Sequence, residues 1–159
     1  MYARILVPVD GSATSRLGLQ EALKLAKVNA SRLCLFHIVN ELVFAHTFDS
    51  GLYADKVIDV LRTQGREILD QTAALVQRHG VPADTVLAES IGGSASRLII
   101  EQAHQWAADL IVMGTHGRRG VRRLALGSDA EDVVRSAMVP VLLVRSTGDR
   151  NDLPLRGAA

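Results

Sequence analysis

Short apolar runs alternate along the chain with segments in which apolar residues recur every three or four positions. Five of the runs have the continuous apolar character of strands buried inside a parallel sheet. They lie at residues 4–9, 32–39, 85–90, 109–113 and 141–144. The segments between them have the period of amphipathic helices and lie around residues 19–26, 54–79, 95–106 and 130–137. The apolar faces expected for the last three comprise Val57, Leu61, Gly65, Ile68, Thr72 and Leu75; Ala95, Leu98, Ile99, Ala103 and Trp106; and Ala130, Val133, Val134 and Ala137.

Strand and helix therefore alternate from the first strand to the fifth, which is typical of an α/β fold with helices on both faces of a parallel sheet. The chain has 159 residues, enough for one domain with a substantial core. We expect a single doubly wound domain over residues 1–146, with the strands in the order 3-2-1-4-5. Residues 147–159 are polar and irregular, and we expect them to form a flexible tail.

Sheets of this kind bind ligands beyond the carboxyl ends of their strands, where the strand order reverses. Two segments are predicted to meet there: "VDGS" after the first strand and "GTHGRRGVRRLALGS", residues 114–128, after the fourth. A connection of that length inside a compact domain is usually either functional or disordered. The strand order decides that these two segments face one crevice.

The glycines of the second segment suit anion binding. Gly114, Gly117 and Gly127 let backbone N–H groups approach a phosphate, and the following helix adds its own N–H groups and dipole. Ser128 has a hydroxyl to donate to a phosphate oxygen. Ser128 also has a purely structural interpretation as the N-cap of a capping box with Glu131, and the two roles are compatible.

Several other functions are excluded or disfavoured. There is no P-loop and no dinucleotide-binding glycine spacing, and a phosphoacceptor domain would need more acids than Asp10. A net charge of +1 and 4% aromatic residues argue against nucleic-acid binding. No apolar stretch is long enough to span a bilayer and no secretory signal opens the chain, so a cytoplasmic location is expected. The histidines lack metal-ligand spacing, and Cys34 is expected to be a buried hydrophobe.

Three segments together resemble the universal stress protein family over residues 2–145: "ILVPVDGS", "DLIVMGTHGRRGVRRLALGS" and "VPVLLV". The Gly-x2-Gly-x9-Gly-Ser spacing is similar to that of the ATP-binding members. The resemblance implies an adenine nucleotide α-hydrolase-like fold that binds ATP, with or without Mg²⁺. It also implies a homodimer in which the final strands, residues 141–144, pair antiparallel, as their apolar edge would favour.

Carried over by position, the resemblance implies a nucleotide site without direct metal ligands or catalytic residues. Asp10 would lie near ribose and adenine, Val39 would contact adenine through its backbone, and the glycine loop would hold the phosphates. The implied binding residues are Pro8, Val9, Asp10, Val39, Met113, Gly114, His116, Gly117, Gly127, Ser128 and Asp129. Asp129 departs from the family, which commonly has a small apolar or hydroxyl residue there; its charge either weakens ATP binding or favours it with a bridging metal.

Individual residues have competing interpretations. Asp10 opens a tight turn and is either a ligand contact or a turn former. His116 is a hydrogen-bonding or solvated residue more than a general base, because no acid partner accompanies it in sequence. Four arginines of the loop either steer phosphate, pair with a partner subunit or form a solvated face; they are Arg118, Arg119, Arg122 and Arg123.

The leading functional hypothesis is an ATP-binding regulatory protein of the stress response, acting through unidentified protein partners. No activated nucleophile or base pair is present in the motifs, so we expect at most slow ATP hydrolysis rather than efficient catalysis. One alternative is an interaction module of the same fold that binds no nucleotide. Another is an enzyme of the wider adenine nucleotide α-hydrolase group.

Overall fold

The computed structural model describes residues 1–40, 51–90, 92, 94–115 and 127–145. Its elements, in chain order, are β1 (Arg4–Pro8), α1 (Ala13–Asn29), β2 (Arg32–Asn40), α3 (Gly51–Arg78), β3 (Ala83–Ser90), α4 (Ala95–Gln105), β4 (Leu110–Gly114), α5 (Ser128–Ser136) and β5 (Val141–Val144). Every strand pair is parallel. The sheet order β3-β2-β1-β4-β5 confirms the predicted topology.

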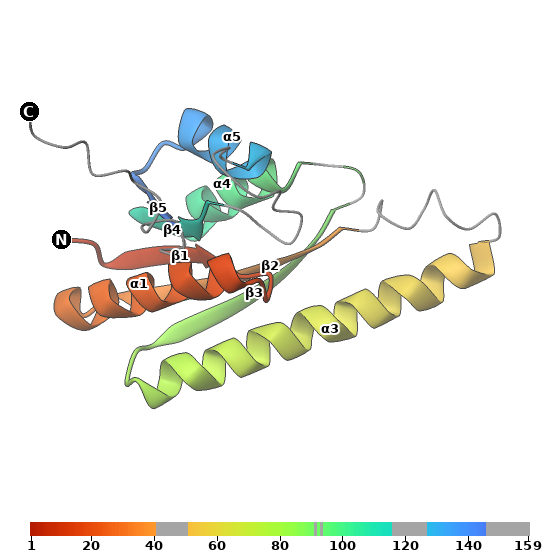
Figure 1. Cartoon of the computed structure of the whole chain (residues 1–159), viewed down its shortest axis with the longest axis horizontal. Helices are drawn as coiled ribbons and strands as arrows, with labels where there is room; N and C mark the ends of the chain where they lie inside the picture. Colours follow the sequence, from red (N-terminus) through yellow and green to blue (C-terminus); the bar gives the residue numbers. More distant parts are fainter. Residues whose placement is uncertain (41–50, 91, 93, 116–126, 146–159) are drawn as a thin grey trace, which may run out of the picture.

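Helices cover both faces of the sheet (Figure 1), with α1 and α3 on one face and α4 and α5 on the other. The faces alternate along β1: Ile5 and Val7 pack with the first pair of helices, whereas Leu6 packs with the second. Phe36 and Ile111 join Leu6, and all of these side chains are almost fully inaccessible to solvent. Apolar residues at successive strand positions are thus needed because both faces are covered. Within the described residues, no helix has the length and apolar character to cross a membrane.

Two of the predicted helical faces differ from the structure. On α3 the deepest contacts are made by Gly65, Leu69 and Val76, which lie on the predicted face or one position beyond it. On α5, Val133 is fully buried as predicted, but the prediction that Val134 belongs to the core is wrong, since it is 49% exposed. The helix has only nine residues and packs at the edge of the molecule, so its buried face is narrow.

Polar contacts fasten the amino ends of β1 and β4 to each other. The Asp109 carboxylate accepts hydrogen bonds from the backbone N–H groups of Ala3 and Arg4, at 2.7 and 3.1 Å. The guanidinium of Arg4 lies over the ring of Trp106, 4.1 Å from its centroid. Trp106 was predicted to continue the core face of α4; it packs, half-buried, against that core as the C-cap of the helix, and its indole N–H donates to Asp84.

Cys34 is a core residue, as predicted. Its side chain is fully buried between the sheet and α4. Burial raises the pKa of the thiol to about 11, because a thiolate would lose its hydration there. The thiol is therefore both inaccessible and almost entirely protonated at neutral pH.

This burial predicts that Cys34 is inert in the native protein. At pH 8 a thiol with a pKa of about 11 is ionised in only about one molecule in a thousand. We expect a disulfide reagent such as Ellman's reagent to modify Cys34 only as fast as the protein opens, and to react at once in denaturant. Rapid stoichiometric modification of the folded protein would contradict the buried position.

Candidate functional site

β1 and β4 separate as they approach their carboxyl ends. Their pairing covers only Ile5 with Leu110 and Leu6 with Ile111, although β4 continues to Gly114. The chain leaves β1 for α1 on one face and leaves β4 for α5 on the opposite face. This is the point where the strand order reverses, so a crevice between the two strand ends is expected here.

The turn after β1 is held by its own polar side chains. The Asp10 carboxylate accepts from the Ser12 N–H at 2.8 Å, and Gly11 has a φ of 78°, in the left-handed region. Ser12 is the N-cap of α1, and its hydroxyl oxygen accepts from the Ser15 N–H at 3.1 Å. The turn-forming interpretation of Asp10 is thus confirmed; contact with a ligand stays a prediction.

Gly114 allows the first turn of α1 to rest against the end of β4. A Cβ at this position would lie 2.7 Å from both the carbonyl carbon and the carbonyl oxygen of Thr14. Gly18, one turn further along α1, also packs against Gly114, since a Cβ added at Gly18 would lie 3.2 Å from the Gly114 nitrogen. Backbone therefore meets backbone here, and only glycine fits.

Thr115 forms the stem of the segment that follows β4. Its side chain is buried, and its N–H donates to the Val144 carbonyl at 3.1 Å. Its own carbonyl accepts from the Gly127 N–H at 3.0 Å. The loop thus leaves and returns at one point, and the start of α5 is fixed beside the end of β4.

The start of α5 differs from the predicted capping box. Gly127, not Ser128, is the N-cap, and Ser128 is the first residue of the helix. Glu131 pairs with Arg135 at 2.6 Å, and its N–H donates to the Gly127 carbonyl at 2.9 Å. The bond from Gly127 to Thr115 starts the helix one residue early, so Ser128 is displaced from the cap. No side chain of the described residues caps this helix.

The other predicted site residues are placed as follows. Val39 and Met113 are buried in the carboxyl halves of β2 and β4. Pro8 is half-buried at the end of β1, Val9 is buried just after it, and Asp129 is exposed in the first turn of α5. His116, Gly117 and the four predicted loop arginines lie outside the described residues.

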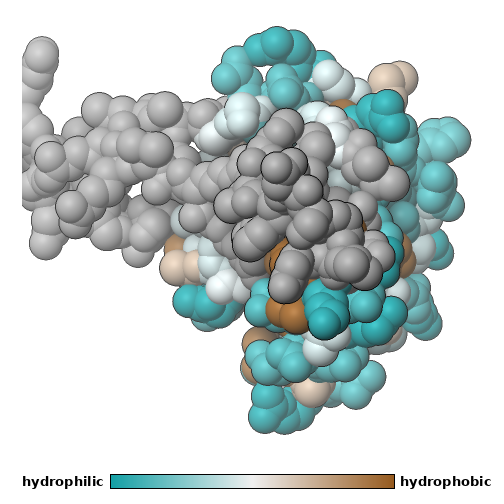
Figure 2. Space-filling model, turned by 90° about the vertical axis from the view of Figure 1, so that its right-hand side faces the viewer, coloured by the Kyte–Doolittle hydropathy of each residue, from teal (hydrophilic) through white to brown (hydrophobic). Residues whose placement is uncertain are grey.

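The assembled site brings two helix N-termini, those of α1 and α5, to the end of β4. The α1 terminus already has Ser12 as its cap and Asp10 beside it, so it is the partial positive charge of the α5 terminus that favours an anion. Figure 2 views the end of the molecule toward which the strands point; its described surface is mostly hydrophilic, with a small hydrophobic patch near the centre. Among the described residues, no group of three or more His, Cys, Asp or Glu side chains is placed to hold a metal ion.

Sequence reasoning missed several residues that shape this site. His37 contacts the Val9 carbonyl, Thr115 closes the loop stem, and Thr14 forms the surface against which Gly114 packs. A histidine inside an otherwise apolar strand was the available signal for the first of these. The other two depend on contacts between distant segments and leave no local pattern.

Known proteins are similar to this chain in sequence and in fold. The sequence profile of the universal stress protein family matches residues 1–145. Universal stress protein MJ0531 of Methanocaldococcus jannaschii is 32% identical over 145 residues, covering 91% of this chain and 83% of that protein. The chain belongs to the universal stress protein family. A solved family structure from Burkholderia pseudomallei is 33% identical, with a TM-score of 0.73 over 91% of this chain and 97% of the other.

Three more distant structures of the same fold contain adenine nucleotides. A universal stress protein in complex with cAMP has a TM-score of 0.63 at 22% identity, covering 91% of this chain and 97% of that one. The protein from Archaeoglobus fulgidus with dAMP has a TM-score of 0.60 at 23% identity over 89% and 97% of the two chains. A family protein from Arabidopsis thaliana with AMP has a TM-score of 0.67 at 16% identity over 92% and 94%.

The backbone contact at Gly114 predicts a cost for any side chain there. We expect Gly114→Ala to lower the free energy of unfolding by about 1–3 kcal/mol, because the methyl group overpacks against the Thr14 backbone. Urea denaturation measures the change. Gly80→Asn is the matched control: Gly80 has a φ of 72° with nothing within 4 Å of a Cβ, and asparagine tolerates that conformation. Equal stability of Gly114→Ala and the parent would contradict the close approach.

Proposed function

We propose that the chain binds an adenine nucleotide in the crevice between the ends of β1 and β4. The observation that carries this proposal is the start of α5, where none of the described side chains supplies a cap and which the Thr115–Gly127 hydrogen bond fixes beside the end of β4. Related structures of the same fold contain AMP, dAMP and cAMP, which supports an adenine nucleotide as the ligand.

The charges of the site suggest how the nucleotide lies. Ribose and adenine go toward Asp10 and Val39, at the ends of β1 and β2, where the Asp10 carboxylate and the Val39 backbone are available. The phosphates go toward Gly127 and Ser128, where helix N–H groups attract negative charge. Asp129 lies in the same helical turn, so a bound triphosphate would be accompanied by Mg²⁺ to offset the carboxylate.

We further propose ATP as the physiological nucleotide and a regulatory role in the stress response, in the cytoplasm, through protein partners that read the bound state. Hydrolysis is slow at most. The competing function is an interaction module of the same fold that keeps its glycines for packing. Gly114 gives that alternative its support, because its packing against Thr14 requires glycine whether or not a ligand binds.

One experiment separates the two functions. Small molecules released by denaturing the purified protein are identified by mass spectrometry, and the nucleotide-free protein is titrated with ATP by calorimetry, with and without Mg²⁺. Released adenine nucleotide, or saturable ATP binding, supports the proposal. An empty protein that binds neither ATP nor AMP leaves the interaction module as the function.

A substitution at the start of α5 tests the phosphate site. Gly127 has φ −63° and ψ 144°, which a valine adopts readily, so Gly127→Val should fold. Its branched side chain blocks the N–H groups that the phosphates need. Losing two charge-assisted hydrogen bonds costs about 3–6 kcal/mol, which weakens ATP binding from micromolar to about millimolar or beyond. Calorimetry measures the loss; Gly80→Asn, at the other end of the molecule, should bind as the parent does.

We also propose a homodimer formed through the outer edge of β5. The carbonyls of Pro140 and Val144 accept hydrogen bonds from β4, so Val141 and Leu143, which alternate with them, direct their N–H and C=O groups to the open edge. Met138, just before the strand, is 94% exposed. An apolar edge with unpaired backbone groups favours antiparallel pairing with a second copy.

The dimer is tested at the backbone of this edge. Val141→Pro removes an outward N–H group and leaves the hydrogen bonds to β4 in place. We expect the parent to sediment as a dimer at micromolar concentration and the variant as a folded monomer. A parent that is monomeric at that concentration would contradict the proposal, as would a variant that dimerises unchanged.

A further inference from the structure

His37 is a buried histidine on β2 that holds the end of β1. Its side chain is 5% exposed, and its Nδ1 lies 2.6 Å from the Val9 carbonyl oxygen. A carbonyl oxygen only accepts, so Nδ1 carries the proton and donates. The backbone ladder between the two strands reaches its last bond where the Val9 N–H donates to the Phe36 carbonyl at 2.8 Å. Val9 is therefore held at its N–H by the backbone of β2 and at its carbonyl by the His37 imidazole.

Gly65 of α3 supplies the space for this ring. A Cβ on Gly65 would lie 2.8 Å from the Cδ2 atom of His37 and 2.8 Å from the Cδ1 atom of Leu87. It would also lie 3.2 Å from the Nε2 atom of the same ring. Glycine is less favourable than alanine within a helix, and here its absence of a side chain lets the ring fit against α3.

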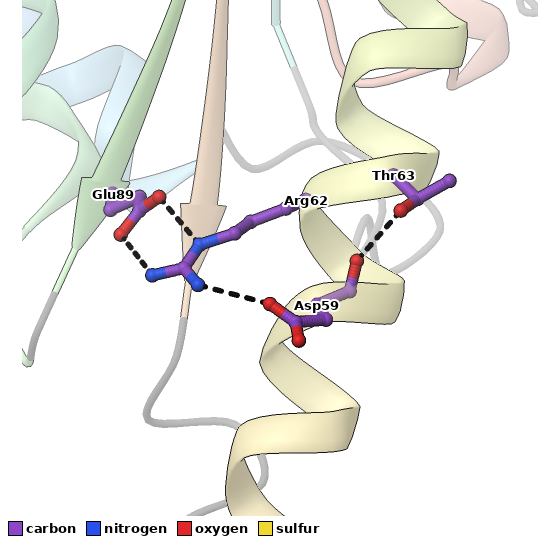
Figure 3. Close-up of polar contacts among 4 residues, drawn as sticks. All are labelled: Asp59, Arg62, Thr63 and Glu89. Atoms are coloured by element: carbon purple, nitrogen blue, oxygen red, sulfur yellow. Dashed lines mark hydrogen bonds and ion pairs between the residues drawn. The ribbon is translucent and has the colours of Figure 1, made fainter.

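An arginine fastens α3 to the sheet one turn before Gly65 (Figure 3). The Arg62 Nε and Nη2 atoms donate to the two carboxylate oxygens of Glu89 at 2.7 and 2.8 Å, and Nη1 donates to Asp59 at 3.1 Å. These hydrogen bonds, those to Glu89 first, raise the pKa of Arg62. Glu89 is the register partner of Val39 on β2. The two Arg62–Glu89 hydrogen bonds thus hold α3 against the sheet beside His37 and beside Val39, a predicted adenine contact.

We propose that His37 is a positioning residue: its Nδ1–H holds the Val9 carbonyl and so fixes the turn from Val9 to Ser12 in the conformation that the ligand crevice requires. The turn continues directly into Ser12, the N-cap of α1, and Thr14 in the first turn of that helix packs on Gly114. An orientation set at Val9 is therefore transmitted to Asp10 and to the helix N-terminus. This inference rests on the proposed nucleotide site for its functional consequence, whereas the positioning of the turn does not depend on a ligand.

The first test uses the protein without ligand. In the ¹⁵N-histidine spectrum we expect His37 to be protonated at Nδ1. His37→Leu removes the donor, whereas His37→Asn places an amide N–H at the same δ position. We expect the backbone amide signals of Gly11 and Ser12 to shift, and their exchange with solvent to quicken, in the leucine variant and to return toward the parent in the asparagine variant. An unprotonated Nδ1, or unchanged signals in the leucine variant, would overturn the positioning role.

The second test measures ATP affinity by calorimetry. His37→Leu should weaken binding about tenfold, on the scale of one hydrogen bond. Gly65→Ala, whose methyl group would overlap the ring, should weaken it in the same direction. His37→Asn should stay within about threefold of the parent. Val76→Ala is the matched control: it is a fully buried position on the same helix, about three turns further along, so it lowers the Tm while leaving affinity unchanged.

The outcomes separate the inference from the proposed function. A parent that binds no nucleotide defeats the proposed function, while the Gly11 and Ser12 signals still decide whether His37 positions the turn. A parent that binds ATP with equal affinity in the leucine, asparagine and Gly65→Ala variants defeats the inference alone. Should His37→Leu not fold, His37→Asn, Gly65→Ala and the Nδ1 protonation of the parent carry the test.

Discussion

The close approach of Gly114 to the Thr14 backbone determines how the carboxyl end of the sheet is built. With 2.7 Å between a would-be Cβ and that peptide, α1 can lie no nearer to β4 and no side chain can come between them. The helix therefore begins directly over the end of β4, with its N-terminal N–H groups at the carboxyl end of the sheet. Gly18 extends the same contact by one turn, so the helix axis is fixed as well as its start.

The other side of the proposed crevice is formed by the start of α5. α1 occupies one face of the sheet at the end of β4 and α5 packs on the other, and the Thr115 carbonyl accepts from the Gly127 N–H where α5 begins. The start of α5 is thereby set by a backbone hydrogen bond rather than by a side-chain cap. An uncapped helix start has its N–H groups available to a ligand, whereas a satisfied cap would compete for them.

The sequence was sufficient to predict the strands, the helices and a sheet covered on both faces, because continuous apolar runs and helical periodicity report burial directly. The expected strand order is also confirmed, although periodicity alone does not dictate it. The sequence was insufficient at the start of α5, where Ser128 and Glu131 have the spacing of a capping box. These residues do lie at the start of a helix, but the N-cap is Gly127 rather than Ser128. The hydrogen bond from the Gly127 N–H to the Thr115 carbonyl joins residues twelve positions apart and leaves no local signal. His37 was missed for the same reason, since its partners Val9 and Gly65 lie on other elements.

The two ends of the proposed crevice differ in charge, and the difference would give a nucleotide bound there one orientation. The Asp10 carboxylate is oriented by the Ser12 N–H, and a carboxylate there repels phosphate while it accepts from neutral hydroxyl donors such as those of ribose. The start of α5 attracts negative charge and has no comparable preference for a sugar. A reversed nucleotide would bring phosphate to the carboxylate and leave helix N–H groups facing a base. For the proposed site, one acid and one helix start would thus select the orientation before any base contact is made.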